Sequence, residues 1–352
     1  MGGRLSPHRP AGGSGVPEYR AAVSPPPPRK SALRRALEIT ITLGFLGFLG
    51  WAVASRWSEV RAVVGELSVA AIGVATLAAF VAVWCNFLSW RALLIDFGST
   101  VPLTGAMRIF FVGQLGKYLP GKLWPILTQA RLGRDYQVPA RASAAAALLV
   151  LLISLGTGLL LTACLLPVLG GAAFERYWWT LLVLPLAAVG LWPPVLNWAL
   201  GRAMKLARRE PMPRPLSLSG IGKSVGWSIL SWILFGGHLW MLLSTLGATG
   251  SDLLLRSVAA FAGSWVIGFL LLVAPAGVGP REVALVALLG STVSQPVGLV
   301  AAAASRLALT VVDLAWPAIA LVLERRRKRR LPDAAAQVPP GGEPSRSPSG
   351  VG

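Results

Sequence analysis

Apolar stretches about twenty residues long alternate with short polar segments along most of this chain. The run from 67 to 88 holds no charged side chain and is long enough to cross a bilayer once. Further runs occur at 36–54, 143–166, 179–200, 225–246, 257–274 and 306–323, with a shorter one at 283–293. Because a helix satisfies its backbone hydrogen bonds within one segment, the pattern predicts an all-α, polytopic helical membrane protein with about eight transmembrane segments.

Two breaks rich in Pro and Gly, at 114–124 and 275–282, interrupt the apolar pattern and carry charged residues. The run that follows the second break, 283–293, is too short to cross a membrane. It either forms a re-entrant half-helix or joins 297–304 across Gln295–Pro296 as one kinked span. The breaks occupy matching places in two halves, which is typical of transporter binding sites. With four crossings in each half, the expected repeat is parallel rather than inverted.

The composition agrees with a membrane protein and excludes several other classes. Apolar residues make up 54% of the chain and charged residues only 13%, whereas soluble proteins carry about 25% charge. The two cysteines, Cys85 and Cys164, each lie in apolar runs, which argues against a disulfide framework or a zinc site. The sequence shows no zinc-protease, serine-hydrolase or P-loop motif. We expect no metal and no cofactor.

The net charge of +19 is concentrated in four segments. They are 1–35, 114–141, 201–223 and 324–352. Because these segments alternate with loops of balanced charge, they follow the positive-inside rule. We therefore expect a multi-pass protein of the plasma membrane with both termini in the cytoplasm, and we attribute no nucleic-acid binding to the charge.

The ends of the chain differ in composition from the middle. Residues 1–35 and 324–352 are predicted to be disordered, basic cytoplasmic tails that flank a transmembrane domain at 36–323. Ala52-Val53-Ala54 resembles a signal-peptidase site, but the long preceding tail favours an uncleaved first helix.

The first break holds the candidate anion-binding residues. Lys117 and Lys122 lie on either side of Pro120-Gly121. Two cations and free backbone N–H groups can hold a phosphate. Both lysines can equally well anchor the chain at the cytoplasmic surface.

Charged residues near the second break and in the last span form a second set of candidates. Arg281-Glu282 either pairs with another charge as a gate or turns towards the cytoplasm. Arg306 and Asp313 lie seven residues apart, hence on nearly the same helix face. An acid within a span usually faces the bundle interior, so we expect Asp313 to pair with Arg281 or Arg306. His238 is interpreted as a packed core residue.

The sequence LGKYLPGKLW at 115–124 resembles the lysylphosphatidylglycerol synthase transmembrane-region family, also described as flippase-like. The family's second motif, Pro-Gly-Gly-x-Gly-x-Arg-Glu, appears here at 275–282, with Ala276 in place of Gly and Pro280 before the Arg-Glu pair. The resemblance covers roughly residues 36–323. The candidate substrate-binding residues are Lys117, Tyr118, Pro120, Gly121, Lys122, Gly277, Gly279, Arg281, Glu282, Arg306 and Asp313.

The resemblance implies a helical module that moves anionic or aminoacylated lipids, or lipid-linked intermediates, between leaflets. Two-domain members of the family add a soluble aminoacyltransferase domain after the membrane part. The 352-residue sequence holds no such domain, so we expect no lysyl transfer and no enzymatic activity from this polypeptide. A separate lipid-modifying enzyme is then an expected partner, beside the anionic headgroups of membrane lipids and a second copy of the chain.

Three functions remain open on the sequence. The first is a lipid translocator whose vestibule binds a phosphate headgroup. The second is a membrane-embedded enzyme of lipid or polyprenyl-phosphate metabolism, for which Asp313, Glu282 and His238 are the available acids and bases. The third is a structural or regulatory membrane protein that uses its basic tails.

Overall fold

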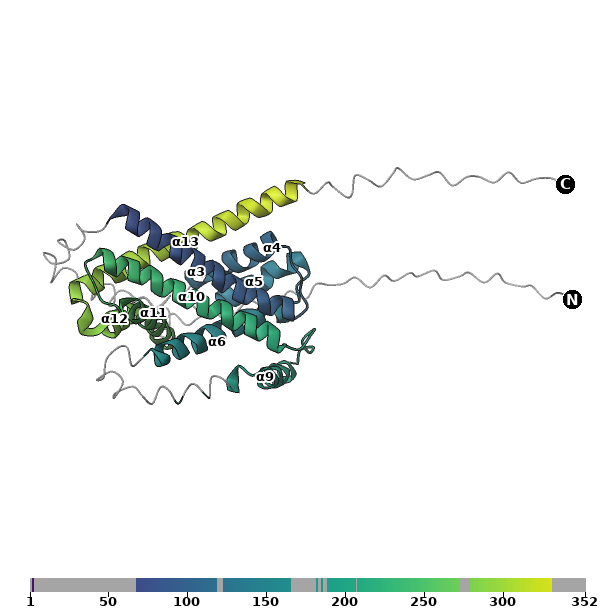
Figure 1. Cartoon of the computed structure of the whole chain (residues 1–352). Helices are drawn as coiled ribbons and strands as arrows, with labels where there is room; N and C mark the ends of the chain where they lie inside the picture. The colour runs from purple at the N-terminus through teal and green to yellow at the C-terminus, as the bar shows by residue number, and fades with distance from the viewer. Residues whose placement is uncertain are drawn as a thin grey trace, which may run out of the picture.

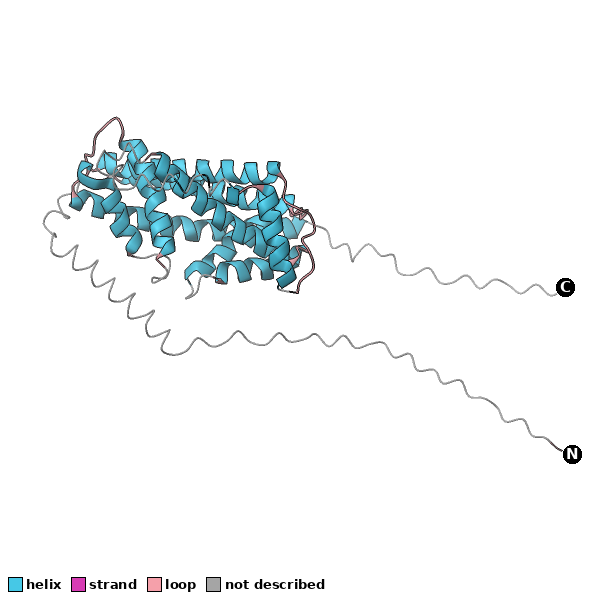
Figure 2. Cartoon of the chain, turned by 90° about the horizontal axis from the view of Figure 1, so that it is seen from below, coloured by secondary structure: helices cyan, strands magenta, loops and turns pink. Residues whose placement is uncertain are grey.

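The structure, a computed structural model, describes residues 68–118, 123–165, 189–206, 208–271 and 279–330, and the isolated residues 2, 182 and 185. All regular structure within these residues is helical (Figure 2), which confirms the predicted all-α class. Five helices are long and apolar enough to cross a membrane. They are α3 (Val69–Asp96), α6 (Ala140–Cys164), α10 (Leu218–Thr245), α11 (Leu253–Leu270) and α13 (Gln295–Arg330).

The polytopic membrane fold is therefore confirmed. The number of about eight spans stays a prediction, because the runs 36–54 and 179–200 lie wholly or partly outside the described residues. The two terminal tails and the signal-peptidase-like site also lie outside them, apart from residue 2 and the part of the C-terminal segment that belongs to α13.

Helices α3 and α10 form the centre of the bundle and run antiparallel beside α13 (Figure 1). Small polar side chains join α3 and α10 at several levels. The Ser89 hydroxyl donates to the Ser224 carbonyl at 2.9 Å, and the Ser231 hydroxyl donates to the Ala82 carbonyl at 2.8 Å. Such contacts let two helices approach closely in a membrane, where burial of apolar surface does not drive helix association.

Aromatic rings attach α13 to this centre. Trp316 stacks on Phe80 of α3, with ring centroids 4.0 Å apart, and on Phe111, with centroids 4.7 Å apart. The Trp316 Nε1 donates to the Phe80 carbonyl at 3.1 Å. A buried indole thus keeps its one polar atom bonded while the ring packs against apolar neighbours.

Two helical hairpins complete the part that holds the site. The first hairpin comprises residues 103–136. Its first arm consists of α4 (Leu103–Met107), the π-helix η1 (Arg108–Val112) and the 3₁₀ helix η2 (Leu115–Tyr118). Its second arm consists of α5 (Trp124–Gly133) and the 3₁₀ helix η3 (Arg134–Tyr136). The second hairpin, residues 253–289, enters through α11 and returns through α12 (Pro280–Leu289). The 3₁₀ helix η7 (Gly290–Thr292) then leads to α13.

The structure corrects two predicted boundaries and excludes one of the two alternatives left open for 283–293. The segment 201–223 is not one loop, because α9 (Pro193–Leu206) continues into it and Ser217 caps the start of α10 through its hydroxyl. Residues 283–293 do not join 297–304 as a kinked span, since Gly290, with φ 63°, terminates α12 and a new helix begins at Gln295. The last helix does not end at Leu323 but runs on through the basic residues to Arg330, so a disordered tail cannot begin at 324.

Candidate functional site

The described residues on either side of the two breaks form the arms of two hairpins. In the first hairpin, Gly105 packs on Tyr136, Gly113 on Gln129, and Gly116 on the Trp124–Pro125 backbone. In the second hairpin, Gly263 packs on Leu288 and Gly268 on Arg281. These pairs run in antiparallel register, so each break reverses the chain. Antiparallel arms of this kind are what a re-entrant arrangement requires, and re-entrance into the membrane stays a prediction.

The hairpins enter the bundle from opposite ends, as their contacts with α13 show. At the outer end of the first hairpin, Thr104 and Tyr136 both donate to the Glu324 carboxylate, at 2.5 and 2.8 Å. Its tip contacts Asp313, eleven residues and so roughly 16 Å earlier on α13.

The second hairpin meets α13 from the other direction. Val286 of α12 packs on Gly298, near the start of α13, and the tip residue Glu282 contacts Arg306. The two contact residues on α13, Arg306 and Asp313, are two helical turns or roughly 10 Å apart. The prediction of a parallel repeat is wrong at this point, because the two hairpins are related in the inverted sense.

At the tip of the first hairpin, a lysine pairs with an acid of α13. The Lys117 Nζ lies 2.6 Å from the Asp313 Oδ2, with 36% of the lysine side chain and 18% of the aspartate side chain exposed. Asp313 was expected to pair with Arg281 or Arg306; it interacts electrostatically with Arg281 and forms an ion pair with Lys117, which was not among the expected partners. Pro317, one turn further along α13, has no N–H to offer the Asp313 carbonyl, which weakens the helix beside the pair.

At the tip of the second hairpin, the hairpin supplies the acid, Glu282, and α13 supplies the cation, Arg306. Gly279 has φ 113°, a conformation that suits glycine, and its N–H donates to the Glu282 Oε2 at 2.6 Å. The other carboxylate oxygen of Glu282 accepts a hydrogen bond from the Arg306 Nε, which also forms the ion pair. Only 8% of the Glu282 side chain is exposed, against 28% of Arg306.

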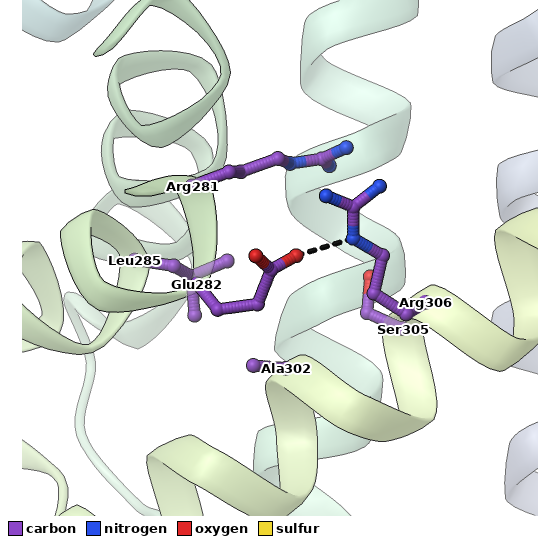
Figure 3. A pocket seen from close by; sticks show the side chains of 6 residues that line it. All are labelled: Arg281, Glu282, Leu285, Ala302, Ser305 and Arg306. Atoms are coloured by element: carbon purple, nitrogen blue, oxygen red, sulfur yellow. Dashed lines mark hydrogen bonds and ion pairs between the residues drawn. The ribbon is translucent and has the colours of Figure 1, made fainter. Parts of the chain in front are cut away.

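A second guanidinium lies beside this pair. Figure 3 shows the Arg281 and Arg306 head groups on the same side of the Glu282 carboxylate. Arg281 also lies over the Phe261 ring, 4.6 Å from its centroid, a cation–π contact. A small pocket separates these residues. Its empty space is about 190 Å³, including the part open to the outside, and Leu285, Ala302 and Ser305 complete its lining.

A fully buried histidine, His238, contacts one of the residues that line the pocket. The His238 Nδ1 lies 2.8 Å from the Ala75 carbonyl, and its Nε2 lies 2.9 Å from the Ser305 hydroxyl. Because a carbonyl only accepts, Nδ1 carries the proton, and in the neutral ring Nε2 accepts from Ser305. The interpretation of His238 as a packed core residue agrees with this geometry, although its partner Ser305 lines the pocket.

The structure therefore brings five of the predicted site residues together. These are Lys117, Arg281, Glu282, Arg306 and Asp313. Gly279 adds its N–H to the same group. Pro120, Gly121, Lys122 and Gly277 lie outside the described residues, and only the backbone of Tyr118 is described.

Sequence reasoning missed Ser305, Phe261 and the close-packed glycines Gly116 and Gly268. None of them carries a charge, and Ser305, Phe261 and Gly268 are each one of many similar residues in apolar segments. A signal for the glycines did exist, since Gly116 lies within the first break and Gly268 precedes the second break by seven positions.

The charges of the described site leave one positive charge in excess, because three cations face two carboxylates. Such a site attracts an anion. Within the described residues no group of three His, Cys, Asp or Glu side chains is placed to hold a metal ion.

Long apolar helices and two charged hairpins that enter from opposite ends define a polytopic membrane protein with an internal charged site. Residues 35–316 match the family described as the lysylphosphatidylglycerol synthase TM region. The match covers most of the chain, so the protein belongs to this family. No curated protein and no solved structure matches the chain.

Proposed function

We propose that this protein moves a phosphate-bearing lipid between the two leaflets of the plasma membrane without changing it chemically. The observation that carries the proposal is the meeting of two oppositely directed hairpin tips on α13, where Lys117, Arg281 and Arg306 gather around two carboxylates. Membership in a family named for a lipid synthase supports a lipid as the ligand.

The internal ion pairs supply a mechanism for holding and releasing a headgroup. A phosphate is an anion that guanidinium and ammonium groups bind through charge-assisted hydrogen bonds. When the phosphate reaches Arg281 and Arg306, it competes with Glu282 for the same donors. When the phosphate leaves, Glu282 takes its place again, so that Arg306 regains a carboxylate partner inside the protein.

The inverted arrangement of the hairpins supports movement between leaflets. Each hairpin enters from its own end of the bundle, and the residues of α13 that the two tips contact lie about two helical turns apart. Inverted repeats with broken helices at mid-depth are typical of transporters that work by alternating access. Both termini lie in the cytoplasm in this proposal, with the first hairpin entering from the cytoplasmic end, where the basic end of α13 lies.

The chain acts as a transporter rather than as an enzyme in this proposal. Both acids of the site form ion pairs with cations, as expected for residues that hold a charged ligand rather than transfer protons. Chemical modification of the lipid is then the task of a separate enzyme, which is an expected partner.

Reconstituted vesicles test the proposal. The purified chain is placed in liposomes with fluorescent phosphatidylglycerol, and crossing is followed by chemical quenching of the outer leaflet. We expect crossing by the wild-type chain, a loss of tenfold or more for Arg306→Gln, and unchanged crossing for Lys223→Gln, which removes an exposed cation of α10 away from the site.

The products of the same vesicles decide between the three candidate functions. Unchanged lipid in the opposite leaflet supports transport. A chemically altered lipid would instead establish an enzyme. Neither crossing nor a product, at equal protein content, would leave a structural or regulatory role and overturn the proposal.

A further inference from the structure

Helix α9 is oriented differently from the long helices of the bundle. Figure 1 shows it nearly end-on, while α3, α10 and α13 run across the picture. Its 14 residues span roughly 21 Å, too little to cross a bilayer. A short helix whose axis crosses the bundle axis, at the end where α10 begins, has the geometry of an element at the membrane surface.

The inner face of α9 fixes this orientation. Leu196 is buried and, with Leu200, packs on the apolar core around α3 and α6. The Asn197 amide binds the backbone of Leu216 twice, since its Nδ2 donates to the carbonyl at 2.9 Å and its Oδ1 accepts from the N–H at 2.8 Å. The next residue, Ser217, donates to the Asp96 carboxylate at the end of α3. These contacts fix the rotation of α9 about its axis, so its opposite face points away from the bundle.

The outer face combines an aromatic side chain with cations. Trp198 is 70% exposed, and Arg202 and Lys205 are exposed as well. Spacings of four and three residues place these side chains on one face of the helix. Arg208 and Arg209, just beyond the end of α9, add two more exposed cations.

We propose that this face of α9 binds the anionic phospholipid headgroups of the adjacent leaflet. An indole ring settles at the level of the headgroups because one part of it is apolar and its N–H is polar. The cations on the same face then meet lipid phosphates, and each contributes to attraction towards an anionic membrane surface. This inference concerns a surface of the protein and does not depend on the transport function.

Lipid-dependent stability tests the inference. The full-length chain, in neutral detergent, is titrated with phosphatidylglycerol or with phosphatidylcholine, and its melting temperature is followed. We expect phosphatidylglycerol to raise the melting temperature more than phosphatidylcholine does. The Arg202→Gln, Lys205→Gln variant should need more phosphatidylglycerol for half of the rise, by roughly fivefold for each cation removed.

A matched control variant distinguishes specific lipid binding at α9 from a general effect of the protein's positive charge. Arg131→Gln, Arg134→Gln removes two exposed cations, three residues apart, from the first hairpin, and should leave the phosphatidylglycerol titration unchanged. An equal shift in both double variants would overturn the inference. Equal stabilisation by polyglutamate would also overturn it, because that result points to an acidic protein as the occupant.

The position of α9 can be measured without removing any cation. A nitroxide is attached at Trp198→Cys in a chain whose Cys85 and Cys164 are replaced by Ala and Ser, in vesicles that contain phosphatidylglycerol. The inference expects stronger collision with oxygen, which concentrates in the bilayer, than with a water-soluble nickel chelate. The reverse order would show that the outer face of α9 lies in water and would reject a lipid contact.

Discussion

The two hairpins bring opposite charges to the same helix. The first presents a cation, Lys117, to an acid of α13, whereas the second presents an acid, Glu282, to a cation of α13. Helix α13 therefore carries one charge of each sign, Arg306 and Asp313, two turns apart. This exchange lets each hairpin form its own ion pair and prevents the two tips from competing for one partner.

The hairpins also differ in how they are built and how deeply their charges are buried. The second hairpin enters through the uninterrupted helix α11, and its acid is almost fully buried. The first enters through a short α-helix, a π-helical turn and a 3₁₀ turn, and its lysine is one-third exposed. Irregular turns of this kind are common at functional sites. Within the described residues, the comparison indicates that the second tip is held firmly and that the first is more adjustable.

The largest effect is expected at the buried pair. Arg306→Gln removes the ion-pair partner of the buried Glu282 carboxylate, which should lower the free energy of unfolding in detergent by about 3 kcal/mol, as for a broken buried ion pair. The Arg306→Gln, Glu282→Gln variant should recover most of that stability, because both members of the pair are then neutral, but it should not recover lipid crossing.

A surface pair provides the control for this prediction. Arg256 and Asp252 form an ion pair at 2.6 Å within the first turn of α11, where Asp252 is more exposed than Glu282. Arg256→Gln should cost less than about 1 kcal/mol, as is usual for exposed pairs. If Arg306→Gln cost no more than Arg256→Gln, the second tip would not be the firmer of the two.

The next largest effect on stability is expected where the two arms of the first hairpin approach each other closely, at Gly116. A Cβ atom added at Gly116 would lie 2.8 Å from the Trp124–Pro125 backbone, which cannot move aside as a side chain can. Gly116→Ala should therefore destabilise the protein by about 1 to 3 kcal/mol. Gly226→Ala, in an open part of α10, should stabilise it by about 0.5 to 1 kcal/mol. Equal effects of the two changes in thermal unfolding would contradict the packing at this tip.

The sequence was sufficient to locate the long helices and both tips. The apolar run 67–88 corresponds to α3, and the Pro- and Gly-rich breaks correspond to the reversals of the two hairpins. These predictions succeeded because hydrophobic length and backbone-breaking residues are local properties. The run 283–293, by contrast, is as apolar as a span, and only its packing against α11 and α13 shows that it turns back.

Pairing of the charges could not be predicted in the same way. Asp313 had several candidate cations, and its shown partner, Lys117, lies almost two hundred residues earlier in the chain. The direction in which each hairpin enters decides which charges meet, and that direction depends on contacts between distant helices. The parallel repeat was expected because apolar runs were counted as crossings.

A smaller effect is expected where the first hairpin is attached to α13. Glu324 accepts hydrogen bonds from Thr104 and Tyr136, one from each arm of the hairpin. Glu324→Gln keeps the size of the side chain but weakens both bonds, at a cost of about 1 to 2 kcal/mol. The rate of lipid crossing should fall together with the stability in Glu324→Gln, if the hairpin must be held at a fixed depth for Lys117 to reach Asp313.

Tyr136 supplies a second measurement of this attachment. Burial, and then the Glu324 carboxylate, raise the pKa of Tyr136. A raised pKa in the folded state adds stability below the unfolded pKa of about 10, and this stability is lost as the pH rises through the folded pKa. Glu324→Gln should lower the pKa of Tyr136, as measured from alkaline absorbance against Tyr136→Phe. An unchanged pKa would mean that the contact between Tyr136 and Glu324 does not form.

The smallest effect on stability is expected at the exposed pair of the first tip, which is the sharpest test of its adjustable character. Lys117→Gln and Asp313→Asn should each cost less than about 1 kcal/mol, because water screens a partly exposed ion pair. Lipid crossing should nevertheless fall in both, since the cation that receives the headgroup or the acid that replaces it is gone. Lys117→Arg keeps the charge but adds a larger, planar group, so it should retain stability and lose crossing. If Lys117→Arg and Lys117→Gln both transported lipid at the wild-type rate, with equal protein in the membrane, Lys117 would serve only to anchor the tip, and the second hairpin alone would hold the headgroup.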